Sequence, residues 1–511
     1  MSLVVDWRVS VGLVGTVYRY LSVPLLGPVG VALVYGEDPL PFLVTILVAV
    51  AVGTALEWQA PDDDLGHREA FLLVALTWLA VPLLGTLPYV IAGNGTVAAP
   101  VDALFESMSG FTTTGATVLG DISFETHSHA MLMWRQLTQW LGGMGIIVLM
   151  VAILPELSVG GARLVREEAP GFDLTKLTPR IRKTARILWA IYIALTAAAV
   201  VVYYGLHLAD VAPNMGLYNA VAHALSSLPT GGFSPEARSV EAFSPAAQWA
   251  IILFMVVAGT NFALFWYAAI GEPGELLGNG EFRAYLTTMA GVSAFVAALL
   301  FTGVGLATVP ENVPAIAGDL EHAARQAVFQ VVAIVTTTGY ASMDFTTWSE
   351  AAQVVLLFAM FLGGSAGSAA GSVKIIRWYV VGKSLRRELF TTVHPEAVRP
   401  LRVDSSVIDE HTFRGLVTFV LVFLVIFALS TVVVFVEGVT NPDLSLSALE
   451  ATSVAIATLG NVGPGFGVVG PMNSFLPFSD PAKLYLVALM WIGRLEILSI
   501  LVILTPSYWR R

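Results

Sequence analysis

Long apolar segments recur from one end of this chain to the other, and they constrain its fold more than any motif does. A helix that crosses a bilayer needs about 20 apolar residues. Hydrophobic residues make up 56% of the 511 positions and charged residues only 12%, which leaves little chain for a soluble domain. The pattern predicts an all-α membrane protein with ten transmembrane helices. The approximate segments are 11–35, 38–56, 70–93, 130–154, 184–207, 246–270, 283–308, 349–381, 412–437 and 482–505.

The charges between these segments predict the orientation of the chain. An even number of spans places both termini on one side of the membrane. Basic residues crowd two connections on that same side, and cytoplasmic loops carry an excess of Lys and Arg. We therefore expect a multi-pass protein of the cytoplasmic membrane with both termini in the cytoplasm. The basic residues are Arg163, Arg166, Lys176, Arg180, Arg182, Lys183, Arg186, Lys374, Arg377, Lys383, Arg386, Arg387, Arg399 and Arg402.

Four outward connections share one pattern, which predicts an internal repeat. Each holds a short apolar stretch followed by a cluster of Thr and Gly, and the connections are 102–118, 219–235, 323–342 and 447–467. One such cluster is an ordinary turn in most proteins, but four at equivalent positions indicate a repeated unit. We expect four repeats of helix, re-entrant pore loop and helix around one pore, preceded by two extra helices. The expected divisions are 1–60 for the leading helices, then 70–155, 180–270, 282–390 and 409–506 for the repeats.

The chemistry of the four loops predicts a filter for a monovalent cation. Rings of carboxylates favour divalent ions, whereas these loops have no Asp or Glu between the short stretch and the central Gly. They offer backbone carbonyls and Thr hydroxyls, and Gly permits the positive φ that turns carbonyls toward one axis. The predicted potassium ligands are Thr113, Thr114, Gly115, Thr230, Gly231, Gly232, Thr337, Thr338, Gly339, Asn461, Val462 and Gly463.

Each short stretch also carries a polar residue at a defined distance from its central Gly. Glu106, His223 and Gln330 each lie nine positions before that Gly. Glu450 lies thirteen positions before it, one helical turn further back, so the fourth repeat differs from the others.

The ordered set of motifs resembles the TrkH/KtrB/HKT superfamily of potassium transporters, in particular its TrkH branch. The resemblance rests on TTTGATV, PTGGFSP, TTTGYAS, GNVGPGFG, WRQLTQWLGGMGIIVL, GGSAGSAAGSVKIIR and WIGRLEIL, and it covers residues 70 to 505. It implies potassium uptake through a gated pore, with potassium as the transported ion and no organic cofactor on this chain. Gly115 stands where Ser accompanies sodium preference in plant relatives, which implies potassium. Pro229 departs from the family pattern, which usually has a small polar residue there.

The resemblance further implies a gate below the filter. The run GGSAGSAAGS is too rich in Gly and Ser to remain a stiff helix, although small residues also serve close helix packing. In the family this region is an intramembrane loop that blocks the path. An Arg inside an apolar span costs roughly 2.5 to 3.5 kcal/mol, so we expect it to face the path as a barrier. The expected gate residues are Gly363, Gly364, Gly367, Gly371, Lys374 and Arg494.

Two neighbours of these residues have simpler expected roles. On a continuous helix Glu496 would lie about 200° around from Arg494, so the two are not expected to pair. Arg135 is expected to be a structural anchor behind the first filter.

The expected partners also follow from the resemblance. It implies a homodimer in the lipid bilayer, in which each protomer has its own pore. It also implies that the cytosolic face, with segments 156–183 and 382–411, docks a ring of TrkA-like (RCK) regulatory subunits. This chain has no GxGxxG after a predicted strand, so a nucleotide would act through that partner. No nucleic-acid partner is expected.

The sequence also bears on two other classes of function, a coupled transporter and an enzyme. A sodium- or proton-coupled secondary potassium transporter usually buries carboxylates at the membrane midplane, and Asp and Glu are scarce within these spans. A membrane-embedded enzyme would need a motif such as HExxH, paired intramembrane Asp or a Ser/Lys dyad. None of these occurs, and the chain has no cysteine.

Overall fold

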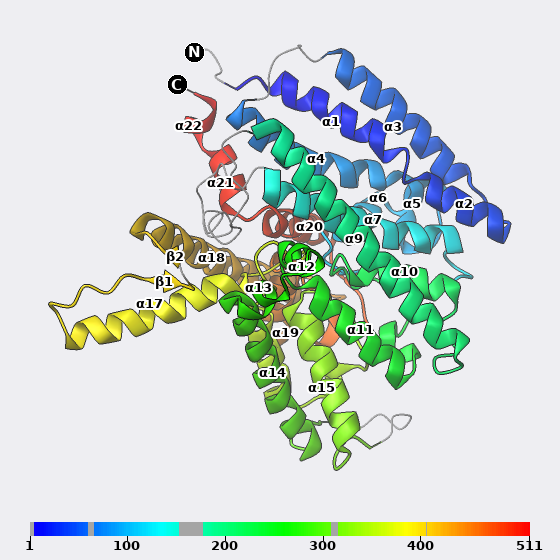
Figure 1. Ribbon diagram of the computed structural model, residues 1–511. Helices are drawn as coiled ribbons and strands as arrows, with labels where there is room; N and C mark the ends of the chain where they lie inside the picture. Colours follow the sequence, from blue (N-terminus) through cyan, green and yellow to red (C-terminus); the bar gives the residue numbers. More distant parts are fainter. Residues whose placement is uncertain (1–4, 60–65, 153–176, 308–314, 405, 511) are drawn as a thin grey trace.

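Helices make up nearly all of the regular structure in the computed structural model, which describes residues 5–59, 66–152, 177–307, 315–404 and 406–510 (Figure 1). Three of the expected cytoplasmic cations, Arg163, Arg166 and Lys176, lie outside the described residues, as does most of the expected docking segment 156–183.

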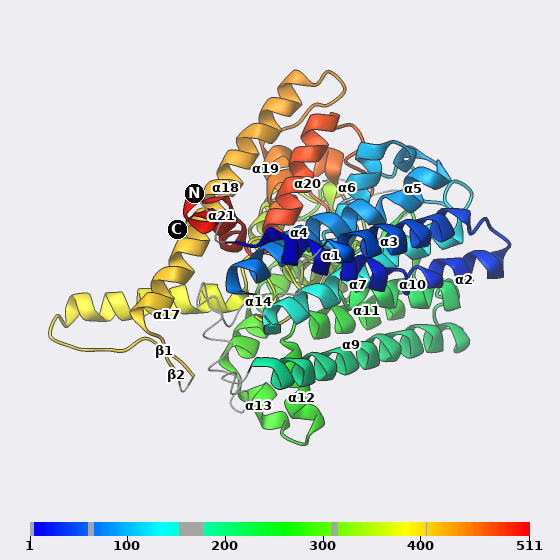
Figure 2. The ribbon, with the colours of Figure 1, turned by 90° about the horizontal axis from the view of Figure 1, so that it is seen from above.

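Three helices precede the four repeats and pack against the first repeat. They are α1 (Trp7–Leu21), α2 (Leu26–Tyr35) and α3 (Leu40–Trp58). Helices α1 and α2 together form one candidate span, Trp7–Tyr35, so the three helices correspond to the two expected leading spans. Helices α1 and α3 touch through two glycines, because a Cβ atom added to Gly15 would lie 2.5 Å from the carbonyl oxygen of Gly53. Such close approach of small residues is typical of helix packing in lipid. In Figure 2 the three helices, in dark blue, cover one side of the bundle.

The remaining chain contains the four expected units of long helix, short helix and following helix. The first unit has α4 (His67–Gly85), α6 (Pro100–Phe111) and α7 (His129–Ala152), and the second has α9 (Leu177–Leu208), α10 (Leu217–Ser227) and α11 (Pro245–Ala258). The third has α14 (Gly280–Phe301), α15 (Leu320–Val335) and α16 (Glu350–Ala359), and the fourth has α18 (Glu410–Thr440), α19 (Ala448–Leu459) and α20 (Asp480–Arg494).

Local sequence signals explain where the short helices begin. Pro100 occupies the first turn of α6, where its missing N–H costs nothing. The Asp319 side chain accepts a hydrogen bond from the backbone of His322 at the start of α15. Helix α19 starts with a capping box made by Ser447 and Glu450, which bond to each other's backbone amides.

The remaining elements lie within, between and after the units. They are α5 (Leu87–Ala92), η1 (Thr96–Ala98), η3 (Ser239–Ala242), α12 (Phe262–Ala269), α13 (Pro273–Gly278), η4 (Phe345–Thr347), α17 (Ile375–Val393), β1 (Arg402–Val403), β2 (Ser406–Val407), η5 (Gly467–Val469), α21 (Leu498–Leu504) and α22 (Pro506–Trp509). Strands β1 and β2 form an antiparallel pair.

Three of the expected spans are broken instead of straight. Segment 246–270 forms α11 and α12, which are bent by 96°, and segment 482–505 forms α20 and α21, which are bent by 112°. Segment 349–381 forms α16 and α17 with irregular chain between them. By length and composition the described residues contain six helices that could cross a membrane, or up to eight if each bent pair is one span. The protein is a multi-pass helical membrane protein, and the count of ten spans stays a prediction.

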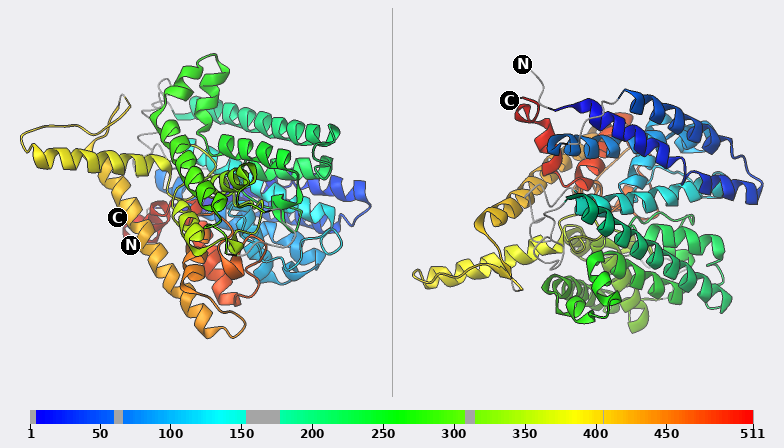
Figure 3. Two further views of the ribbon diagram at one scale, coloured as in Figure 1. Left: turned by 90° about the horizontal axis from the view of Figure 1, so that it is seen from below. Right: turned by 45° about the horizontal axis from the view of Figure 1, so that its top comes forward.

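The two ends of the described chain lie side by side (Figure 1). An Arg68 guanidinium nitrogen donates to the carbonyl oxygen of Tyr508 at 2.9 Å, and Val5, Leu72 and Tyr508 form a small apolar cluster. This placement agrees with an even number of crossings. Figures 2 and 3 show α17, with β1 and β2, projecting from the bundle as an arm. The arm carries Lys383 and its neighbouring basic residues, which belong to the second expected cytoplasmic cluster.

Candidate functional site

The four loops that follow the short helices share one unusual backbone conformation. A positive φ is uncommon for any residue except Gly, and for β-branched Thr it is strained. The first residues of the four filter segments are Thr113, Thr230, Thr337 and Asn461, with φ of 51°, 57°, 54° and 53°. The central glycines two positions later are Gly115, Gly232, Gly339 and Gly463, with φ of 81°, 81°, 74° and 103°. All four loops keep this conformation, including the fourth, where Asn461 replaces Thr, which indicates that the position of the backbone matters in each loop.

The four loops close into a ring. A Cβ atom added to Gly115 would lie 2.3 Å from the carbonyl oxygen of Gly231 in the next loop. A Cβ atom added to Gly232 would lie 1.8 Å from the Thr338 carbonyl oxygen, and one added to Gly339 would lie 2.2 Å from that of Val462. A Cβ atom added to Gly463 would lie 2.5 Å from the carbonyl oxygen of Thr114. Each central glycine therefore faces the carbonyl that precedes the central glycine of the next loop, and the fourth loop returns to the first. No larger residue fits at these positions without moving the ring.

The ring forms the floor of an open vestibule. All four central glycines line this single pocket, together with residues of the segments that follow the filters, including Ser234, Pro464 and Phe475. Arg135 and Glu236 contribute charged groups to its wall. The structure thus brings the four predicted filter segments together around one pocket.

Side chains behind the ring hold it in place, and most of the Thr hydroxyls are already bonded. The Thr114 hydroxyl is 2.8 Å from that of Thr112 and accepts a 2.9 Å bond from the Asn461 amide. The Thr338 hydroxyl is 2.8 Å from that of Thr336. The buried Thr113 hydroxyl has no hydrogen-bond partner among the described residues, so it remains available to an ion or a water. Backbone carbonyls are the main oxygens that the ring offers.

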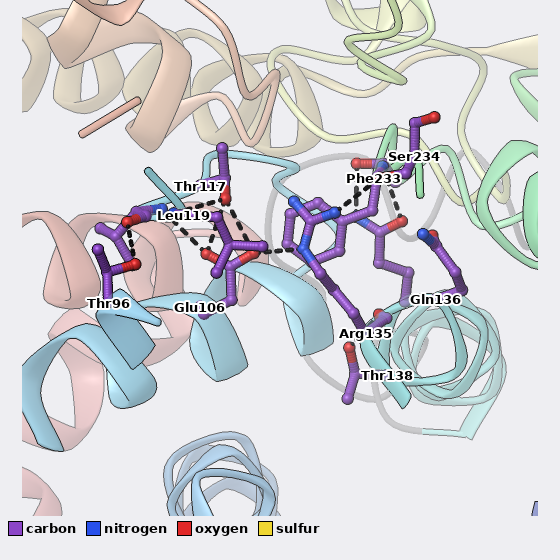
Figure 4. A network of polar contacts seen from close by, with 12 residues as sticks. Thr96, Glu106, Thr117, Leu119, Arg135, Gln136, Thr138, Phe233 and Ser234 are labelled. Carbon is purple, nitrogen blue, oxygen red and sulfur yellow. Dashed lines mark hydrogen bonds and ion pairs between the residues drawn. The ribbon is translucent and has the colours of Figure 1, made fainter. Parts of the chain in front are cut away.

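The polar residues of the short helices anchor the chain that follows each filter. Glu106 accepts hydrogen bonds from the Thr117 hydroxyl and the Val118 backbone, both at 3.0 Å (Figure 4). A nitrogen of the His223 ring lies 3.1 Å from the Ser234 hydroxyl, and the Gln330 amide donates to the Ser342 hydroxyl at 3.1 Å. In the fourth unit Glu450 accepts from the backbone of Val468 at 3.1 Å. Glu450 therefore also bonds to the chain that follows its filter, although it lies one helical turn further back than the corresponding residues.

The predicted gate is an irregular loop, 360–374, that lies against the filter. The Gly371 amide donates to the Thr337 hydroxyl at 2.7 Å, and a Cβ atom added to Gly371 would lie 2.5 Å from the Gly460 carbonyl oxygen. At the loop's other end, a Cβ added to Gly364 would lie 2.7 Å from the Gly259 carbonyl oxygen, where α11 breaks. The Gly363 amide donates to the Val373 carbonyl at 2.8 Å. Gly367 has a φ of 78° beside the Asn261 side chain.

Both predicted gate cations bond to this loop. The Lys374 ammonium donates to the carbonyl oxygens of Ala370 and Ser368, the second at 3.4 Å. Arg494 donates to the carbonyl of Ala369 at 2.8 Å and to that of Gly142 on α7 at 3.4 Å. The Arg494 side chain is only 3% exposed. It therefore links the end of α20 to the middle of the loop.

Arg494 and Glu496 do not pair, but the reason differs from the helical argument. Helix α20 ends at Arg494, and Glu496 has a left-handed φ of 54° at the bend before α21. Glu496 instead forms an ion pair with Arg377 at 2.5 Å, and Arg377 also lies over the Phe419 ring. The premise of a continuous helix was wrong, because the chain turns at this point.

Two residues of the site were missed in the sequence. The Gln139 amide donates to the ring carbonyl of Gly231 at 2.7 Å, and its oxygen accepts from the Phe233 backbone at 3.1 Å. The buried Glu281 carboxylate accepts from the Ala366 amide of the gate loop at 2.5 Å. A polar side chain inside or at the end of an apolar span was the available signal for both.

Comparison with known proteins agrees with this geometry. A family model described as a cation transport protein matches residues 41–511. The chain belongs to the TrkH family of cation transport proteins. The expected resemblance is thereby confirmed, and as a member of the TrkH family the chain is a transport protein and not an enzyme.

Relatives within the TrkH family match over their full length. The Trk system potassium uptake protein TrkH of Vibrio parahaemolyticus is 36% identical, over 99% of this chain and 100% of that protein. The Escherichia coli K12 protein of the same name is 34% identical, over 99% of each chain. The crystal structure of the potassium transporter TrkH from Vibrio parahaemolyticus superposes with a TM-score of 0.85 at 34% identity, over 99% of this chain and 100% of that one.

Proposed function

We propose that this chain is the pore-forming membrane subunit of a potassium uptake system, with the carbonyl ring as its selectivity filter. The ring of alternating glycines and carbonyl oxygens, closed across four loops, carries the proposal. A potassium ion that sheds water needs several neutral oxygens at once, and backbone carbonyls supply them. Membrane proteins named for potassium uptake that are 34–36% identical over their full length support the same assignment.

The short helices add a field that favours a cation at the ring. Each ends directly before its filter segment, at Phe111, Ser227, Val335 and Leu459. A helix carries about half a negative charge at its C-terminal end, and four such ends converge here. This field attracts a monovalent cation without the tight binding that a ring of carboxylates would give.

We assign loop 360–374 as the gate of this pathway. It contacts the filter residue Thr337 and also Gly460, which ends α19 just before the fourth filter segment. Lys374 and Arg494 donate hydrogen bonds to its carbonyl oxygens. These tethers fix a closed arrangement, and opening requires the loop to leave Arg494. The guanidinium also adds a positive charge that opposes the passage of cations.

The assembly around the pore is part of the same proposal. The chain forms homodimers in the cytoplasmic membrane with both termini in the cytoplasm. Cytosolic nucleotide-binding subunits of the TrkA kind dock on the face that carries the basic residues of α17. The adjacent described ends of the chain and the basic arm support this orientation.

A pair of glycine variants tests the filter assignment. The purified protein is reconstituted into liposomes that are loaded with potassium, and the uptake of rubidium is followed with and without competing sodium. Gly232→Ala places a methyl group 1.8 Å from the Thr338 carbonyl oxygen, so potassium-selective uptake is lost. Gly216→Ala, in the same repeat, meets no atom within 4 Å and serves as the matched control.

The result can also contradict the proposal. A folded Gly232→Ala protein with wild-type uptake and selectivity would show that the ring is not the filter. Wild-type uptake that requires an imposed sodium or proton gradient would indicate the coupled secondary transporter instead.

A further inference from the structure

A buried ion pair behind the first filter reaches across to the second. Glu106 on α6 and Arg135 on α7 are joined at 2.5 Å, and their side chains are 0% and 2% exposed. The second branch of the guanidinium donates to the Ser234 carbonyl oxygen at 3.0 Å, beyond the second filter. Figure 4 shows Arg135 between Glu106 on one side and Phe233 and Ser234 on the other.

The contacts of Arg135 use the shape of its guanidinium. The group lies over the Phe233 ring, with its central carbon 3.6 Å from the ring centroid. A guanidinium spreads its donors over three nitrogens of one rigid planar fork, whereas an ammonium group carries all its donors on one compact nitrogen. Phe233 directly follows the central glycine Gly232, so Arg135 holds the second loop immediately beside its filter residue.

The polar residue on the short helix makes different contacts in the first unit than in the other three. The side chains of His223, Gln330 and Glu450 bond to the chain that follows the filter of their own unit. Glu106 makes that contact through Thr117 and also engages Arg135, which crosses to the second unit. The first and second loops are therefore fastened to each other by one continuous set of bonds.

Charge balance favours a geometric role over an electrostatic one. Arg135 lines the vestibule through which cations enter. A guanidinium at that entrance would repel them if it were alone, and the Glu106 carboxylate cancels most of this field. A neutral pair of buried ions contributes little attraction or repulsion for a passing cation, so its value must come from the positions it fixes.

We infer that Arg135, held by Glu106, is a positioning residue for ion discrimination, which sets the spacing between the first and second filter loops. This inference rests on the proposed function, because it assumes that the ring selects potassium. The size of a carbonyl cage depends on how its walls are held, and here one ion pair holds two of the four walls.

The test compares variants that separate shape from charge. Arg135→Lys keeps the charge but cannot reach Glu106, Ser234 and the Phe233 face together. The double variant Glu106→Gln with Arg135→Gln keeps the entrance neutral and removes the fork. For both, the preference for potassium over sodium should fall by about tenfold, equivalent to about 1.4 kcal/mol, while maximal rubidium uptake changes less. Rubidium uptake in liposomes with sodium competition measures both quantities.

A second buried arginine provides the matched control. Arg325 pairs with Glu321 at 2.9 Å and donates to Gln248, but it is not among the residues that line the vestibule. Arg325→Lys should leave ion preference unchanged. Phe233→Leu removes the ring under the guanidinium and keeps both members of the ion pair. It should lower the preference as well, and it carries the test if the ion-pair variants do not fold.

Several outcomes overturn the inference. Arg135→Lys or Phe233→Leu with full potassium preference would show that the fork does not set the filter. A double variant with wild-type preference would show that charge balance alone matters. An equal loss in Arg325→Lys would point to general destabilisation. Wild-type protein without potassium preference would refute the proposed function itself, which separates the two failures.

Discussion

Replacement of Arg494 by alanine should accelerate potassium flux, because the guanidinium repels cations in the proposed path and also holds the gate loop in place. Its bond to the Ala369 carbonyl, at 2.8 Å, is a hydrogen bond from a charged donor, which contributes about 1.5 to 3 kcal/mol. The 3.4 Å bond to Gly142 contributes little. Loss of the lower value, about 1.5 kcal/mol, shifts the loop toward release by roughly tenfold.

The charge itself acts in the same direction. At an effective dielectric constant of about 20, a unit charge roughly 8 Å from a passing cation raises its energy by about 2 kcal/mol. Flux through Arg494→Ala should therefore rise at least about tenfold, without a cytosolic partner. The acceptors of Arg494 are backbone carbonyls, so the change strands no carboxylate. Size-exclusion behaviour and thermal stability should stay near those of the wild type.

Rubidium uptake in liposomes that contain only the purified chain measures this effect. Arg494→Lys keeps the charge and loses the fork, so it separates the electrostatic barrier from the tether. Arg414→Ala removes a charge whose side chain is 79% exposed, and it should change nothing. The reasoning is refuted by an Arg494→Ala protein that folds normally and conducts no faster. Aggregation of that variant would identify Arg494 as a structural residue instead.

Three further predictions test other parts of the site. Gly115→Ser should admit sodium while the protein still folds, because its Cβ would meet the Gly231 carbonyl oxygen; full potassium preference in flux assays would remove Gly115 from the filter. Lys374→Met should raise basal rubidium uptake severalfold, since the loop loses the ammonium that binds the Ala370 carbonyl; an unchanged or lower rate would contradict a closing role. The chain should form homodimers with one pore in each protomer, and cross-linking in mild detergent that yields only monomers would weigh against this.

The repeat was predictable because each filter loop is marked by a short local motif of Thr and Gly. The central glycines stand where positive φ is required, and the structure gives all four of them that conformation. The run from Gly363 to Gly371 likewise indicated an irregular segment, which the structure places against the filter. These features depend on local backbone preferences, so the residue type at a single position predicts them.

The bends and cross-links were not predictable, because they depend on residues far apart in sequence. Helix α11 stops where the Gly259 carbonyl accepts a bond from Ser365 of the gate loop, and no local signal in 246–270 announces that partner. Segment 482–505 is apolar enough to count as one span despite Arg494 and Glu496, and its hydropathy does not predict the 112° bend between α20 and α21. The bonds from Gln139 to Gly231 and from Arg135 to Ser234 likewise join different units. Only packing of the whole bundle brings such groups together.

The closed ring has an evolutionary consequence, because its four quarters belong to one polypeptide. In a channel assembled from identical subunits, every substitution in a filter appears four times at once. Here a change at Asn461, which stands where the other loops have Thr, alters one quarter and leaves three intact. The preference of such a filter can drift by small increments through working intermediates. A fused pore is thus free to become asymmetric, and the amide of Asn461 beside the Thr114 hydroxyl is an asymmetry of that kind.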